Sequence, residues 1–214
     1  MLALVLATIL TVGCPPKCRD YYPFYYPLAV NNTWEYTMGT VTTIRGSQDT
    51  TFTRTDSSQT TVIAETTYFG DSVWKLRSQS TSTTDTAYTY IGQENGEIRD
   101  YPPPDLCGAT VRTILQLPLA ENATWTVQLS EYGGVVKERA TVEAHGPLTV
   151  PAGTFSDAWE VDYVQLYSQP IETTQTWYVD GIGVAKSRTS RTTVFGSDTT
   201  TEVTTTSLTN YTVR

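Results

Sequence analysis

Apolar and polar residues alternate along short stretches from residue 33 onward. The clearest examples are Trp34–Thr37, Val73–Arg77, Trp159–Val164 and Thr176–Val179. A period of two is the pattern of a strand with one face buried and one face solvated. The body of the chain is therefore predicted to consist of β-strands.

Glycine-containing turns separate these stretches, and sustained helical periodicity is missing from the sequence. Asn95-Gly96 suits a two-residue type I′ hairpin, because both central positions of that turn need a positive φ. The best helix candidate, residues 109–117, is short and rich in β-branched residues, so a strand is favoured there. The predicted fold class is all-β, an antiparallel curved sheet or an incomplete barrel or sandwich.

An internal repeat divides the chain. Pro27–Trp34 recurs as Pro118–Trp125, with six of eight residues identical. Weaker echoes join Val73-Trp74 to Ala158-Trp159 and Thr84–Tyr88 to Thr174–Tyr178. We therefore expect a single β domain over residues 27–214, made of two pseudo-repeats of roughly 90 residues (27–117 and 118–214) that share one continuous sheet.

Three motifs carry a family resemblance. The Pro-Leu-x-x-x-x-Thr-Trp opening, the turn Thr149–Phe155 and the segment Trp177–Lys186 resemble those of a group of uncharacterised bacterial cell-envelope lipoproteins. The resemblance implies an incomplete β-barrel or strongly curved antiparallel sheet on a lipid tether, and no catalytic residues. Asn31 and Asn122 stand where that group has Gly, and Asn is the non-Gly residue best suited to positive φ. Both turns are expected to keep their geometry.

The N-terminal segment predicts export. Residues 1–13 are uncharged and nearly all apolar, too short for a membrane-spanning helix but suited to a signal peptide. Leu10–Cys14 resembles a lipobox, in which the Cys becomes the first mature residue and carries the lipid. It departs from that motif in having Thr11 where Leu is preferred, and no basic residue precedes it. We expect a signal peptide at 1–13 and a lipid-tether segment at 14–26. The alternative is that 1–13 forms a first buried strand.

The cysteine count fits this interpretation. If Cys14 is acylated, Cys18 and Cys107 remain to form one disulfide in an oxidising compartment. The rival pairing joins Cys14 to Cys18 and leaves Cys107 free. A Cys-x3-Cys pair without His or further Cys makes a poor zinc site, so no metal is expected.

Composition and charge narrow the candidate chemistry. A net charge of −8 without any basic run argues against nucleic-acid binding, and 41 threonines among 214 residues favour β-structure. His145, the single histidine, has no partner that the sequence can name. The acid pairs Asp100/Asp105 and Asp157/Glu160 are expected at solvated strand ends. We expect no enzyme activity and no cofactor.

Aromatic and threonine-rich segments offer contact surfaces. A cluster of aromatic residues just past the tether could contact a protein partner, an acyl chain or a glycan: Tyr21, Tyr22, Phe24, Tyr25 and Tyr26. The tryptophans in the strands are expected in the core. The threonine-rich stretch 198–214 is expected to complete its own sheet, and strand exchange with a neighbour is the alternative.

Together these patterns predict a lipid-anchored, non-enzymatic protein of the cell envelope, periplasmic or on the surface, or else extracellular. Its role is predicted to be binding or structural, with the membrane as a partner through the N-terminal lipid. A subunit of an extracellular filament assembled by strand exchange is the first alternative, and a periplasmic carrier of an apolar ligand is the second.

Overall fold

The structure is a computed structural model that describes residues 25–46, 49–68, 70–83, 85–103, 111–131, 134–166 and 171–214. These residues form twelve strands: β1 (Thr33–Arg45), β2 (Thr50–Tyr68), β3 (Asp71–Ser80), β4 (Thr86–Glu94), β5 (Glu97–Tyr101), β6 (Arg112–Gln116), β7 (Thr124–Glu131), β8 (Gly134–Val150), β9 (Gly153–Leu166), β10 (Ile171–Val179), β11 (Gly183–Phe195) and β12 (Asp198–Thr212). No helix occurs among the described residues, and the favoured strand near 109–117 is present as β6.

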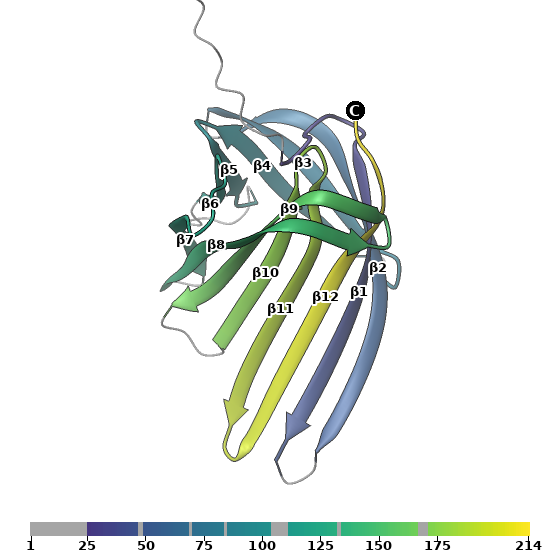
Figure 1. Ribbon diagram of the computed structural model, residues 1–214, viewed down its shortest axis with the longest axis vertical. Coiled ribbons are helices and arrows are strands. Elements are labelled where there is room, and N and C mark those ends of the chain that lie inside the picture. The colour runs from purple at the N-terminus through teal and green to yellow at the C-terminus, as the bar shows by residue number, and fades with distance from the viewer. Residues whose placement is uncertain are drawn as a thin grey trace, which may run out of the picture.

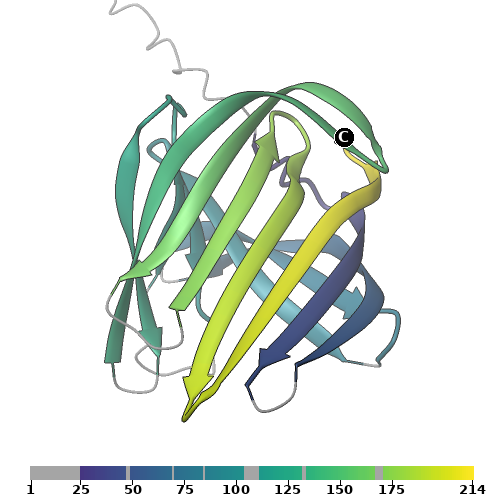
Figure 2. The same ribbon diagram turned by 60° about the horizontal axis from the view of Figure 1, so that its bottom comes forward.

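All twelve strands belong to one antiparallel sheet, in the order β6-β5-β4-β3-β2-β1-β12-β11-β10-β9-β8-β7. The sheet curves into a nearly closed barrel, with β6 and β7 at the two ends of the order (Figure 1, Figure 2). The all-β prediction is confirmed, as an incomplete barrel. The first six strands meet the last six where β1 pairs with β12, from Thr33 opposite Thr212 to Arg45 opposite Thr199.

Four strands at this junction are long. β1, β2, β11 and β12 have 13, 19, 13 and 15 residues, whereas β5 and β6 have 5 each. The hairpin ends of β1–β2 and β11–β12 project beyond the rest of the barrel (Figure 1). We call this part the extension; it comprises residues 39–46, 49–55 and 189–204.

The predicted turns are confirmed. Asn31 and Asn122 have φ angles of 73° and 64°, and Asn95 and Gly96 have 51° and 78° between β4 and β5. The two Pro-Leu-Ala turns also make the same backbone hydrogen bonds. The Asn31 amide donates to the Val62 carbonyl at 2.8 Å, and the Asn122 amide donates to the Val142 carbonyl at 2.8 Å. In each half, this bond fastens the turn to the second strand after it, β2 in the first half and β8 in the second.

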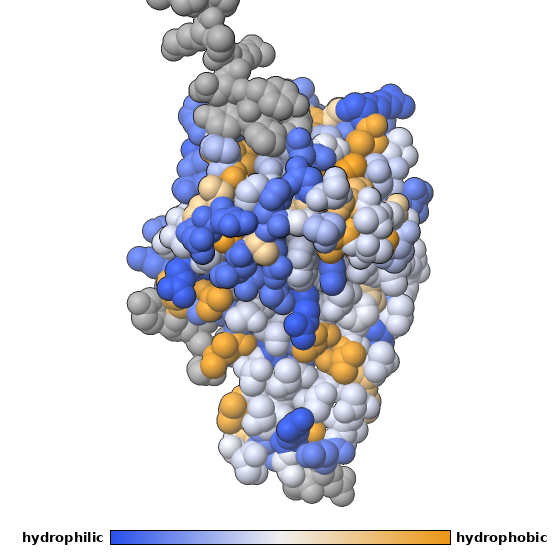
Figure 3. Space-filling view, viewed as in Figure 1, coloured by the Kyte–Doolittle hydropathy of each residue, from blue (hydrophilic) through white to orange (hydrophobic). Residues whose placement is uncertain are grey.

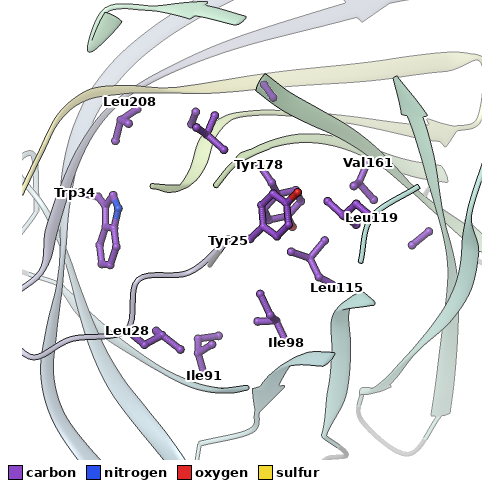
Figure 4. Close-up of a cluster of buried hydrophobic side chains, with 14 of the residues drawn as sticks. Tyr25, Leu28, Trp34, Ile91, Ile98, Leu115, Leu119, Val161, Tyr178 and Leu208 are labelled. Carbon is purple, nitrogen blue, oxygen red and sulfur yellow. The ribbon is translucent and has the colours of Figure 1, made fainter. Parts of the chain in front are cut away.

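The core lies inside the barrel and includes residues that precede the first strand. Tyr25 and Leu28 are 4% and 7% exposed and pack among Ile91, Leu115 and Tyr178 (Figure 4). The segment 25–32 therefore fills one end of the barrel, where burial of apolar surface stabilises the fold by roughly 25 cal/mol per Å².

A buried asparagine joins the two ends of the described chain. Asn32 is fully buried; its side-chain amide donates to the Pro27 carbonyl at 2.6 Å, and its side-chain oxygen accepts from the Arg214 amide at 3.1 Å. Both polar ends of the side chain are thereby satisfied, as burial requires.

The two repeated tryptophans differ in one hydrogen bond. The Trp34 indole donates to the Ile182 carbonyl at 2.6 Å, whereas the Trp125 indole nitrogen is buried without a partner among the described residues. Both side chains are at least nine-tenths buried, at 3% and 7% exposed. The same substitution at these two sites therefore removes similar apolar surface but a hydrogen bond at only one of them.

We expect Trp34→Phe to lower the free energy of unfolding by about 1–3 kcal/mol more than Trp125→Phe, because only the first leaves a carbonyl, that of the half-buried Ile182, without its donor. Chemical denaturation of both variants beside the wild type measures the difference. Equal losses would show that the hydrogen bond of Trp34 adds nothing to stability.

Candidate ligand-binding cavity

Most residues of the predicted anchor lie outside the described part of the chain. These are Cys14, Cys18, Cys107, Tyr21, Tyr22 and Phe24. Acylation of Cys14, the Cys18–Cys107 disulfide and the contact role of these aromatic residues stay predictions.

Tyr25 and Tyr26, the last two residues of the predicted tether, point into the barrel. Tyr25 is buried in the core, and Tyr26 is half-buried with its ring 6.4 Å from that of Tyr178. These two side chains therefore line the interior of the fold instead of an outer patch. This orientation could not be predicted from the sequence, because an aromatic cluster before the first strand has no periodicity that would assign it to a face.

The single histidine has a partner that the sequence did not reveal. On β8 and β9, His145 contacts the Asp157 carboxylate through Nε2 and stacks on Trp159, with ring centroids 4.0 Å apart. Both His145 and Asp157 are exposed. Glu160, the other member of that acid pair, accepts instead from the Gln175 amide at 3.0 Å. The two acids therefore have separate partners.

Beyond Tyr26 the interior contains two adjoining cavities, of about 370 Å³ and about 180 Å³. Tyr26 and Val184 line both of them. The larger is lined also by Arg112, Ile114, Val127, Glu138, Tyr163, Glu172, Thr174, Thr176, Tyr178 and Ser187. The smaller is lined also by Trp34, Tyr36, Thr60, Leu76, Ser78, Thr89 and Ile91. We call the two together the barrel cavity.

Hydroxyl groups dominate the polar lining. The Tyr163 hydroxyl donates to the Ile114 carbonyl at 2.7 Å, and the Tyr178 hydroxyl lies 2.9 Å from that of Tyr163, within hydrogen-bonding distance. The Tyr36 hydroxyl donates to the Val184 carbonyl at 3.0 Å. These bonds fix the directions of the phenols around the cavity.

Tyr26 differs from the other phenols. Its ring touches both parts of the cavity, yet among the described residues none hydrogen-bonds its hydroxyl. No described residue therefore competes with a molecule in the cavity for this hydroxyl. Burial raises the pKa of the Tyr26 phenol far above its usual value, so this hydroxyl is neutral at physiological pH.

The charges in the cavity do not favour anions. The Arg112 guanidinium is held 2.7 Å from the Asp100 carboxylate, and the other charged residues of the lining, Glu138 and Glu172, are acids. Burial raises the pKa of Asp100 from its ordinary value, against the opposing effect of Arg112. The cavity suits a neutral polar ligand better than a phosphate or a carboxylate.

The sequence carried a signal for this lining. Thr174, Thr176 and Tyr178 follow one another at a spacing of two in β10, so all three share a face. What the sequence could not show was that this face is the inner one. That depends on how β10 is placed in the curved sheet between β9 and β11, which alternation within the strand does not specify.

In the described part of the chain, no group of three or more His, Cys, Asp or Glu side chains is placed to hold a metal ion. Nor do the described residues form any helix of the length and apolarity that crossing a membrane requires. On the face seen in Figure 3, apolar residues are scattered among polar ones.

No family model matches the sequence, and neither does any curated protein. Among solved structures, the chain is similar to a candidate lipoprotein from Parabacteroides distasonis, with a TM-score of 0.47, 13% sequence identity and coverage of 89% of this chain and 99% of that one. It is also similar to a candidate exported protein with a YmcC-like fold from Bacteroides fragilis, with a TM-score of 0.49, 10% identity and the same coverage of 89% and 99%. Both likenesses are distant.

The buried phenols predict alkaline unfolding. Burial raises the pKa of Tyr25 to about 12 and that of Tyr178 well above its usual value. Phenols in the unfolded chain lose their protons near pH ~10. The contribution of the buried phenols to the free energy of unfolding is therefore fully present below that pH and is lost as the pH rises through their raised pKa values. We expect tyrosinate absorbance and loss of β-sheet circular dichroism to appear together in an alkaline titration.

Tyr178→Phe should make the free energy of unfolding less sensitive to alkaline pH, by about 1.4 kcal/mol for each pH unit above ~10. Tyr88→Phe, at a side chain that is 45% exposed, is the matched control and should leave that sensitivity unchanged. Ionisation of every tyrosine near pH ~10 without unfolding would contradict burial of these phenols.

Proposed function

We propose that this protein is a non-catalytic binding protein of the cell envelope, anchored through a lipid on Cys14, and that the barrel cavity holds a small neutral sugar. The hydroxyl lining of the cavity is the observation that carries the proposal. Tyr178 and Thr174 on β10 and Tyr26 from the segment before β1 line one space.

The chemistry of the lining favours a sugar over other small molecules. A hydroxyl both donates and accepts, so a wall of hydroxyls matches a ligand whose own hydroxyls do the same. The rings of Tyr26 and Tyr178 add apolar faces for the C–H side of a sugar. An apolar ligand would leave the Tyr26 hydroxyl without a partner among the described residues, at a cost of roughly 1–3 kcal/mol.

The two alternative functions find less support. A carrier of an apolar molecule needs an apolar cavity, but Tyr25 and Leu28 of the chain itself fill the apolar end of the barrel. Filament assembly by strand exchange needs the C-terminal strand to be available. β12 instead lies in the middle of the sheet, paired with β1 on one side and β11 on the other.

The envelope location rests on the N-terminal sequence. An apolar segment followed by Cys14 suits export and acylation, and the cavity of an anchored protein would then face an extracytoplasmic compartment. The paired Cys18 and Cys107 of the proposal fit the same oxidising environment.

A printed array of neutral hexose glycans, from mono- to hexasaccharides, tests the binding proposal. We expect binding to some of them, and calorimetry of the best monosaccharide should show about tenfold weaker binding to Thr174→Val, which loses a cavity hydroxyl at nearly constant shape. Absence of binding across the array would contradict the proposal.

Thr192→Val is the matched control for this variant. Its hydroxyl lies 3.4 Å from that of Thr201, as the Thr174 hydroxyl lies 3.0 Å from that of Thr189, but Thr192 does not line the cavity. Affinity should therefore be unchanged in Thr192→Val. Equal losses in the two variants would show that the effect comes from sheet stability and not from contact.

The anchor is tested by the intact mass of the non-reduced protein from its native membrane. We expect loss of residues 1–13, a diacyl or triacyl addition on Cys14 and two hydrogens missing from Cys18 and Cys107 together. A mature chain that keeps residues 1–13 or lacks a lipid would contradict the anchor without affecting the cavity.

A further inference from the structure

A third cavity, of about 300 Å³, lies outside the barrel on the inner face of the extension. It is lined by Met38, Thr40, Thr42, Phe52, Thr53, Arg54, Asp56 and Glu202. Phe52 is 57% exposed, unlike the buried rings of the barrel core. We call this third cavity the extension cavity.

A row of four threonines connects the two cavities. Thr174, Thr189, Thr204 and Thr40 stand in register on the adjacent strands β10, β11, β12 and β1. The hydroxyls of Thr174 and Thr189 lie 3.0 Å apart, and so do those of Thr204 and Thr40. Thr174 lines the barrel cavity and Thr40 lines the extension cavity. The row spans three strand spacings, or roughly 14–15 Å.

Charged residues follow the threonine row on the side nearer the hairpin ends. Glu172, Arg191 and Glu202 are in register on β10, β11 and β12, and the register continues through Thr42 to Phe52. Carboxylates accept, and a guanidinium donates, pairs of hydrogen bonds. Such groups suit the vicinal hydroxyls of a sugar chain lying along the threonines.

We propose that the sugar site continues out of the barrel cavity along the threonine row into the extension cavity, so that its ligand is an oligosaccharide and not a single sugar. This inference rests on the proposed function. Phe52 would then stack on a distal sugar unit, while Thr174 contacts the unit in the barrel.

A neutral sugar chain fits this surface better than a peptide. Peptides that extend a sheet pair with the free edge of a strand. The strands of the row, β10, β11, β12 and β1, each have a partner on both sides, so their backbone groups are already used. A ligand here meets side chains alone, and those side chains are mainly hydroxyls.

Neutral glycans of increasing length test the inference on the full mature protein. From monosaccharide to tetrasaccharide of the hexose series that the array selects, we expect affinity to rise about tenfold or more. Phe52→Ala should remove this gain and leave the monosaccharide affinity as in the wild type, since only the longer chains reach Phe52.

Phe195→Ala is the matched control. Phe195 is 86% exposed on the same extension but does not line the extension cavity, so its removal should leave the gain with length intact. Circular dichroism of each variant checks that the sheet is retained.

The outcomes separate the two proposals. If every length binds with one affinity, or if Phe52→Ala matches the wild type at all lengths, the extended site is wrong. A monosaccharide affinity that still depends on Thr174 would then support the barrel cavity alone. If no length binds, the proposed function fails together with this inference.

Discussion

Pairing of β1 with β12 is the constraint on which the rest of the structure depends. It joins the first and last of the described strands along the chain, over thirteen residues of β1, and these two strands lie in the middle of the sheet order. Without it, the chain would be two open six-stranded sheets with four exposed edges, which are templates for aggregation. The contact of Asn32 with the Arg214 amide lies at the end of the same junction.

The curved sheet encloses an interior, and apolar side chains of the chain fill only one end of it. Tyr25, Leu28 and Trp34 occupy the end near the Pro-Leu-Ala turns, and the inner positions there are apolar. Further along the long strands, the extension projects beyond the rest of the barrel (Figure 1), and Thr40 and Thr204 are paired there and half-buried. Side chains on such a surface meet water, and hydroxyls tolerate both water and a polar ligand. The gradient from apolar to hydroxyl thus follows the geometry of the sheet.

Local rules account for what could be predicted from the sequence. Alternation found the strands, and the φ preferences of Asn31, Asn95 and Asn122 found three turns, because these depend on neighbouring residues alone. The weaker echo that matches Tyr88 with Tyr178 does not correspond to equivalent pairing in the sheet. Trp159 lies opposite Tyr178, but its counterpart Trp74 lies opposite Ile91 and not opposite Tyr88. Bulges shift the register by single residues, and sequence identity cannot count them. The inward aim of Tyr26 and the contact of His145 with Asp157 depend on distant strands and could not be predicted either.

The candidate site belongs to the junction and to neither half of the chain. Thr174, Thr189 and Thr204 come from the last strands, whereas Thr40 comes from the first, and the hydrogen bond between Thr40 and Thr204 joins residues 164 positions apart. Tyr26 lines the barrel cavity from the segment that Asn32 binds through the Pro27 carbonyl. A lining assembled in this way exists only when β1 has paired with β12. Binding at this site would therefore stabilise the β1–β12 pairing, because any ligand that contacts both sides of a junction favours the joined state.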